Sequence, residues 1–118
     1  MLQADIRRGE LDRDLTFIEE VHTTGDSNED IISWREITTN PTVKARRREL
    51  PGREVAVGDQ LKYVQRTEFV IVYRTDLNEK NRCVFGGRVY EIISVTETAQ
   101  RKMYLQIMAN LLDTEVWT

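Results

Sequence analysis

The chain has 118 residues, of which 40% are hydrophobic and 31% are charged. This balance is typical of one folded domain with a modest core, and it excludes a chain that is disordered throughout. The net charge of −3 argues against a generic nucleic-acid binder, because such proteins usually carry a strong basic excess.

The first part of the chain is predicted to contain three strands. Residues 13–23 and 31–38 place apolar side chains largely at alternate positions, a pattern typical of half-buried strands. The acidic, turn-rich residues 24–30 between them indicate a hairpin loop. Pro41 interrupts the pattern, because proline cannot donate a backbone hydrogen bond. A third strand is therefore expected only after it, at residues 42–47.

Residues 46–60 are predicted to form a long loop. The segment contains two turn signals, Pro51-Gly52 and Gly58-Asp59, and the stretch between 48 and 50 is long enough for no more than a single helical turn. Loops of this length are uncommon in compact domains, and they are usually functional or disordered.

The second half of the chain is predicted to be a meander of antiparallel strands. Residues 60–74 would reach about 50 Å as one strand, so a bend is expected near Gln65-Arg66. Gly86-Gly87 separates two β-rich runs and predicts a tight hairpin, because both positions of such a turn need positive φ. Residues 103–112 are apolar at every second position, which favours a strand over a helix. Trp117, in the tail, is expected either to pack back or to contact a partner.

These elements predict an all-β fold, a small antiparallel β-barrel of about six or seven strands with a long internal loop. No repeat, low-complexity run or linker divides the chain, so residues 1–118 are expected to form a single domain. The candidate core consists of large apolar and aromatic side chains from the predicted strands: Phe17, Trp34, Phe69, Ile71, Tyr90, Ile92, Leu105 and Ile107.

The sequence offers little catalytic chemistry. Cys83 and His22 are the only residues of their kinds, and a nucleophilic pair between them is far less probable than ordinary structural roles. One cysteine and one histidine provide too few ligands for a typical metal site. Gly86-Gly87 lacks the helix and the lysine of a phosphate-binding loop. We therefore predict no enzyme active site, no metal and no cofactor.

Lys44, Arg46, Arg47 and Arg48 form the one basic cluster. It is either a solvated patch or a surface that meets phosphate or the acidic side chains of another protein. One candidate function is therefore a small β-barrel adaptor that binds nucleic acid or a peptide through residues 44–48. The absence of interleaved aromatic residues argues against single-strand binding. DNA binding that falls steeply with salt would support the adaptor.

A series of short motifs follows in a specific order along residues 9–112. Its most specific parts are the strand Thr67–Arg74 and the hairpin Gly87–Val95, and its other members are Gly9–Arg13, Trp34, Val43-x-Ala45, Gly52-Arg53-Glu54 and Arg82. In order and spacing, this series resembles the phage head–tail joining family, also called head-closure or stopper proteins.

The resemblance implies a small β-barrel that assembles into a ring below the portal and adaptor rings of a tailed phage. Such a ring retains the packaged DNA and provides the surface on which the tail docks. The implied partners are further copies of the chain, portal or adaptor proteins, tail proteins and the DNA in the channel, with no membrane. The protein would be made in the bacterial cytoplasm and reside at the head–tail interface of the virion.

In this family the long loop projects toward the channel, which here corresponds to residues 46–60. The candidate channel-facing or subunit contacts are Lys44, Arg46, Arg47, Arg48, Arg53 and Glu54. Glu68 is expected to form ion pairs between subunits with basic residues such as Arg88 or Lys62. Each exposed ion pair of this kind contributes little to stability. The isolated protein is expected to be a monomer that forms a ring only on a preformed platform.

Overall fold

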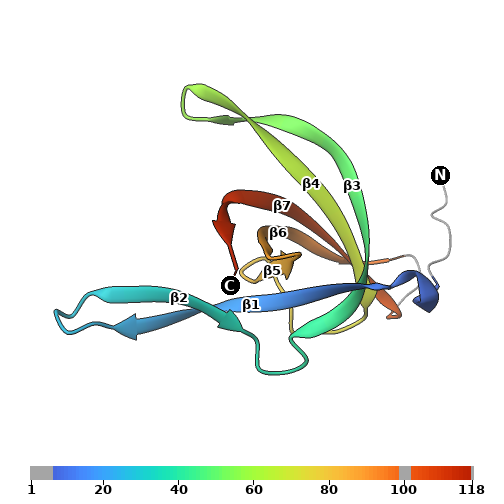
Figure 1. Ribbon diagram of the computed structural model, residues 1–118, viewed down its shortest axis with the longest axis horizontal. Helices are drawn as coiled ribbons and strands as arrows, with labels where there is room; N and C mark the ends of the chain where they lie inside the picture. The colour runs from blue at the N-terminus through green and yellow to red at the C-terminus, as the bar shows by residue number, and fades with distance from the viewer. Residues whose placement is uncertain (1–6, 99–101, 118) are drawn as a thin grey trace.

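The computed structural model of the chain describes residues 7–98 and 102–117, without the side chains of Arg53, Val55, Val57, Lys62, Tyr63, Asp113 and Thr114. This part of the chain forms a short 3-10 helix and seven antiparallel strands (Figure 1). The elements are η1 (Arg8–Glu10), β1 (Arg13–Thr24), β2 (Asp30–Glu36), β3 (Thr42–Val57), β4 (Gln60–Val72), β5 (Arg82–Phe85), β6 (Arg88–Glu97) and β7 (Tyr104–Val116).

Six of the strands close into a barrel-like ring. The strand order is β2-β1-β3-β4-β7-β6-β5, and β1 also pairs with β5, so the sheet returns to its own beginning. The closing pairs include Phe17 with Cys83. Closure leaves the barrel wall without free edges. The structure confirms the all-β, antiparallel, barrel-like fold that the sequence predicted.

The first hairpin leaves the barrel because β1 pairs with three strands in succession. Its residues 13–16 pair with β3, residues 16–18 with β5 and residues 18–24 with β2. Beyond Ile18, β1 pairs with β2 alone among the described strands, and the two strands project as a ribbon, at left in Figure 1. We name residues 19–36 the β1–β2 arm.

The prediction of a loop over residues 46–60 was wrong. β3 continues to Val57 and β4 begins at Gln60, so the segment is part of one long hairpin. The register of this pair shifts between Leu50 and Arg53, which makes Pro51 and Gly52 a β-bulge rather than a turn. A bulge accommodates proline because a bulged residue does not need a backbone N–H group for the hydrogen bonds between the strands.

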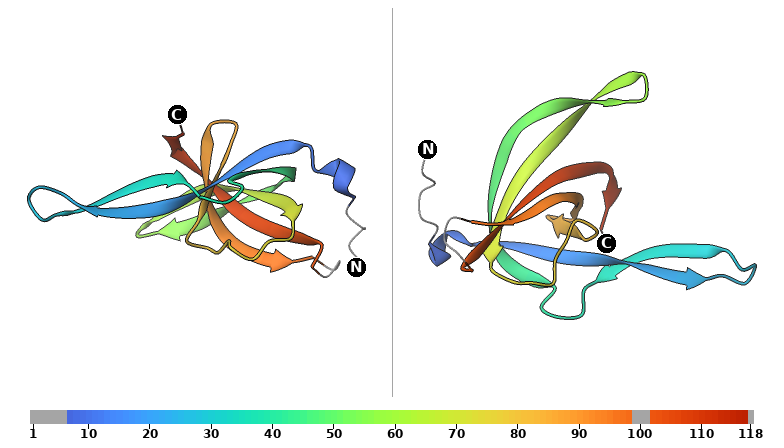
Figure 2. Two further views of the ribbon diagram at one scale, coloured as in Figure 1. Left: turned by 90° about the horizontal axis from the view of Figure 1, so that it is seen from below. Right: turned by 180° about the vertical axis from the view of Figure 1, so that it is seen from behind.

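The outer half of this hairpin also extends beyond the barrel. Pairing of β4 with β7 begins only at Arg66, whereas its pairing with β3 continues outward to the turn between Val57 and Gln60. The hairpin rises to the top of Figure 1, and Figure 2 shows from behind that it diverges from the β1–β2 arm. We name residues 51–65 the β3–β4 arm.

The barrel interior holds the main core. Of the candidate core residues, all but Trp34 are buried there, namely Phe17, Phe69, Ile71, Tyr90, Ile92, Leu105 and Ile107. Trp34 is half-buried in a separate cluster with Ile18 and Trp117, because β2 lies outside the closed ring. The Arg82 guanidinium carbon lies 4.2 Å from the centroid of the Trp34 ring. The prediction that Trp34 belongs to the main core was therefore wrong.

The C-terminal end packs back on the barrel. β7 extends beyond the predicted strand to Val116, and the backbone N–H of Trp117 donates to the Gly87 carbonyl at 2.9 Å. The predicted hairpin turn is present, with φ of 60° at Gly86 and 78° at Gly87. Within the described ranges, no helix has the length and apolar character needed to cross a membrane.

Candidate assembly site

The two arms project from the barrel and present their surfaces to other molecules. β1 and β3 are neighbours in the barrel wall through residues 13–16 and 42–45, and beyond these residues the two arms diverge (Figure 2). The molecule is accordingly elongated, with extents of 54 × 39 × 23 Å. A two-stranded ribbon alone is only marginally stable in water. The arms are therefore candidate surfaces for contact with other proteins.

The β1–β2 arm is acidic and exposes apolar side chains. Its residues 19–36 contain six acidic side chains and one arginine, Arg35. Ile31 and Ile32, near its outer end, are 43% and 53% exposed. Because adjacent strand residues point to opposite faces, both faces of the ribbon present an isoleucine. The sequence pattern of alternating strand residues did not single out either of them as functional.

His22 lies on this arm between two carboxylates. Its Nδ1 atom is 3.1 Å from Asp30 Oδ2, and its Nε2 atom is 3.1 Å from Glu20 Oε1. The hydrogen bond to Asp30 and the nearby negative charges raise the pKa of His22 above its ordinary value. The ring is exposed, so this arrangement is a polar surface contact rather than a buried catalytic group.

Cys83 lies far from His22 along the sheet. The thiol is fully buried in the barrel core, and burial raises its pKa. Cys83 pairs with Phe17, and His22 lies farther along β1, about 16 Å away at strand spacing. The structure therefore does not bring these two side chains together as a nucleophile and base.

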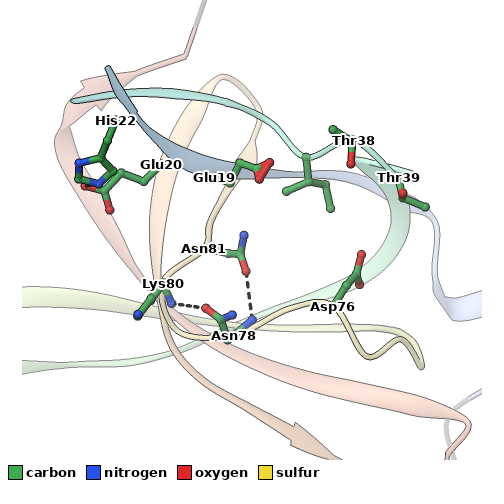
Figure 3. A pocket seen from close by; sticks show the side chains of 10 residues that line it. Glu19, Glu20, His22, Thr38, Thr39, Asp76, Asn78, Lys80 and Asn81 are labelled. Atoms are coloured by element: carbon green, nitrogen blue, oxygen red, sulfur yellow. Dashed lines mark hydrogen bonds and ion pairs between the residues drawn. The ribbon is translucent and has the colours of Figure 1, made fainter. Parts of the chain in front are cut away.

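An open polar cleft of about 670 Å³ lies between β1 and the segment that precedes β5. In Figure 3, His22 and Glu20 lie at one end of the cleft, and Thr39 and Asp76 lie at the other. In the parts of the chain that are described, no three His, Cys, Asp or Glu side chains group as metal ligands would.

Several polar side chains at this cleft hold the segment before β5 in place. The Asn78 side chain accepts from the Lys80 N–H at 2.8 Å, and the Asn81 amide donates to the Ile18 carbonyl at 3.2 Å (Figure 3 shows the first). Arg74 donates to both carboxylate oxygens of Asp76 at 2.6 Å, which lowers the pKa of that carboxyl. These groups are already engaged in structural contacts.

The predicted basic cluster is neutralised within the chain. Lys44 Nζ lies 2.7 Å from Asp14, and Arg47 Nη2 lies 2.6 Å from Glu49. Arg46 contacts both Glu10 and Glu68 at 3.2 Å, and Arg48 contacts Glu68 at 2.9 Å. Glu54 is exposed on the β3–β4 arm, and the side chain of Arg53 lies outside the described residues. The structure thus brings the basic cluster together with carboxylates rather than leaving it as an open basic patch.

Glu68 occupies the centre of this network. Its side chain is 1% exposed, on the face of β4 opposite the buried ring of Phe69. It accepts hydrogen bonds from Arg46 and Arg48 of β3 and from Gln106 of β7. The expectation that Glu68 pairs between subunits was wrong, because its carboxylate is buried and bound within one chain.

The family model of phage head completion proteins matches residues 6–112. The chain belongs to this family. The match confirms the resemblance that the motif series suggested, and it makes the protein a structural component of the virion. No curated protein matches the chain.

Two solved structures share the fold of this head completion protein. A chain from the virion of a native gene transfer agent particle has a TM-score of 0.67 and 20% identity, covering 85% of this chain and 93% of that one. Protein SF1141 from Shigella flexneri 2a has a TM-score of 0.69 and 21% identity, covering 93% of this chain and all of its own. At these identities the likeness establishes the fold alone.

A head completion protein acts through other virion proteins, and the geometry identifies where such contacts are available. The exposed apolar side chains outside the core include Ile32 on one arm, Leu61 on the other and Ile93 on β6. None of these three was predicted from the sequence as a contact residue. Their exposure depends on which strands enter the closed ring, which the alternation pattern does not specify.

Proposed function

We propose that the protein forms a ring with other copies of itself between the DNA-filled head and the tail. In that position the ring retains the packaged DNA and provides the surface on which the tail docks. The observation that carries this proposal is the pair of arms that leave one closed barrel wall. A rigid body with two separate arms can contact a neighbour through one arm while the other faces elsewhere. Such non-equivalent contacts generate a closed ring when the rotation from copy to copy closes.

The β3–β4 arm is the element that we propose to face the channel. It covers most of the segment that we expected to project toward the channel, although it is a hairpin rather than a loop. Beyond the bulge at Pro51 and Gly52, the two strands of the arm pair with each other and not with β7 in the described residues. Leu61, next to its tip, is 71% exposed. This bulge is the point at which the arm can change direction.

DNA retention in this proposal depends on obstruction rather than on affinity. The net charge is −3, and Lys44, Arg46, Arg47 and Arg48 each contact a carboxylate of the same chain. Nonspecific DNA affinity comes mainly from the release of counterions condensed on the DNA when lysine and arginine side chains neutralise its phosphates. Cations that are already paired with carboxylates release few of these counterions. This is also the reason to favour the ring over an adaptor that binds nucleic acid through residues 44–48.

Shortening the β3–β4 arm tests the proposal. Arg53 and Val64 are direct partners in the β3–β4 pair, so an Asn-Gly turn can join them in place of residues 54–63 while Val64 and the barrel strands are kept. We expect particles with this protein to attach tails but to lose their DNA, because the channel is no longer obstructed. The measurement is the fraction of DNA-filled, tailed particles in electron micrographs.

The matched control replaces Gly58-Asp59 by Asn-Gly, which keeps the arm at full length and should preserve filled heads. Circular dichroism of both purified proteins establishes that the barrel still folds. If the shortened protein folds, enters particles and retains DNA as the control does, the β3–β4 arm does not close the channel.

A further inference from the structure

A concave groove on the outside of the barrel contains polar atoms without partners. It has a volume of about 280 Å³ and lies across β4, β6 and β7, with Val64, Ile93 and Met108 as its apolar lining. Arg66 and Asn110 face each other across the β4–β7 pair at the same groove. The Arg66 Nε and Asn110 Oδ1 atoms are buried and have no hydrogen-bond partner among the described residues.

These features favour an occupant with both apolar and polar groups. Ile93 is the extra residue of a bulge in β6, since the register with β7 shifts between Ile92 and Ser94, and its side chain is 50% exposed. An unpaired buried donor and an unpaired buried acceptor are unfavourable until something bonds them. The Arg66 guanidinium also selects for a negatively charged partner.

The β1–β2 arm carries the complementary groups. Ile32 is 53% exposed, and Asp30 lies two positions before it on the same face of β2, about 6.6 Å away. His22 contacts only the Oδ2 atom of Asp30, so the second carboxylate oxygen is available for a guanidinium. β2 is the edge of the sheet, and its outer backbone N–H groups can donate to an acceptor such as Asn110 Oδ1.

The arm and the groove belong to separate parts of one molecule. In the closed ring, β3 separates β1 from β4, and β5 separates β1 from β6. The arm is continuous with β1 and projects away from the barrel (Figure 1), so it reaches a groove on another copy rather than its own. A donor surface and a different acceptor surface on the same chain produce a head-to-tail contact that repeats from copy to copy.

We propose that Ile32 of one copy inserts between Val64, Ile93 and Met108 of the next copy, where Asp30 bonds Arg66. This inference rests on the proposed ring function and adds the subunit contact that builds the ring. A groove of about 280 Å³ accommodates only a few side chains, so one contact alone is weak. The contact persists where many copies are held side by side, and the free protein is then a monomer.

A paired-cysteine experiment in assembled particles tests this contact. The variant combines Ile32→Cys with Met108→Cys, and the particles are oxidised and separated on a non-reducing gel. We expect a ladder of disulfide-linked multimers that collapses to monomer on reduction. Each single variant should give no ladder, and neither should Ile32→Cys combined with Glu97→Cys, which is an exposed position at the end of β6. The native Cys83 is fully buried and does not interfere.

A charge reversal supplies a second, independent measurement. Asp30→Arg and Arg66→Asp should each lower the amount of protein in particles, and the double variant should restore it because the ion pair is re-formed with opposite orientation. Circular dichroism of each purified variant separates loss of contact from loss of fold. Absence of both the ladder and the rescue would overturn this contact. If the wild-type protein is nevertheless at the head–tail junction, the proposed function stands and only this contact fails.

Discussion

Replacement of Phe69 by alanine is expected to lower the free energy of unfolding by about 3–5 kcal/mol. The Phe69 side chain is fully buried in the barrel core. Its ring lies 5.8 Å from that of Phe85 and 5.5 Å from that of Tyr90, edge to face. Loss of the ring removes these contacts and leaves a cavity that a closed barrel wall cannot collapse to fill. Denaturant unfolding followed by circular dichroism measures the change.

The matched control for this core substitution is Leu61→Ala. Leu61 is 71% exposed on the β3–β4 arm, so its truncation should change the free energy of unfolding by no more than about 0.5 kcal/mol. A loss of less than about 1 kcal/mol for Phe69→Ala would be incompatible with a core closed on all sides by the six strands.

Glu68→Ala is expected to lower the free energy of unfolding by about 2–4 kcal/mol. Removing one member of a buried ion pair usually costs about 3–5 kcal/mol, and the loss here is reduced because the partly exposed Arg46 and Arg48 can turn toward water. The substitution leaves the donors of β3 and β7 without the carboxylate that joins them. Thermal and denaturant unfolding of the purified variant provide the measurement.

Arg48→Ala separates the role of the carboxylate from that of one exposed partner. The Arg48 side chain is 61% exposed, and Glu68 keeps Arg46 and Gln106 after the substitution, so a loss of at most about 1 kcal/mol is expected. If Glu68→Ala is no more destabilising than Arg48→Ala, Glu68 does not act as the buried centre of the network.

The strands with clear local signals were predictable from the sequence. The Gly86-Gly87 turn and the apolar alternation of residues 103–112 correspond to the observed β5–β6 hairpin and to β7. These features depend on neighbouring residues only, since a tight turn needs positive φ and a half-buried strand needs period two. The family resemblance was also available from the order of the motifs, and the family model confirms it.

Other features depend on contacts between distant residues and could not be read from the sequence. Pro51-Gly52 has the same local signature in a turn and in a bulge, and only the pairing of Arg53 with Val64 beyond it decides between them. Trp34 lies outside the main core because β2 is the strand that the ring excludes.

The candidate site was less predictable than the fold, because its properties depend on which charged side chains contact each other in the folded chain. The sequence places Arg46 and Arg48 in a basic cluster, but the carboxylate that neutralises both is Glu68, on the next strand. The groove between β4, β6 and β7 exists only because these strands are adjacent in the closed sheet. No local pattern encodes either arrangement.

The most direct test of the ring is electron cryomicroscopy of DNA-filled, tailed particles that contain this protein. The proposed function predicts a ring of barrels between the portal and the tail, with the β3–β4 arms directed into the channel. Density for this protein away from the head–tail junction, or β3–β4 arms that point away from the channel, would contradict the proposed function.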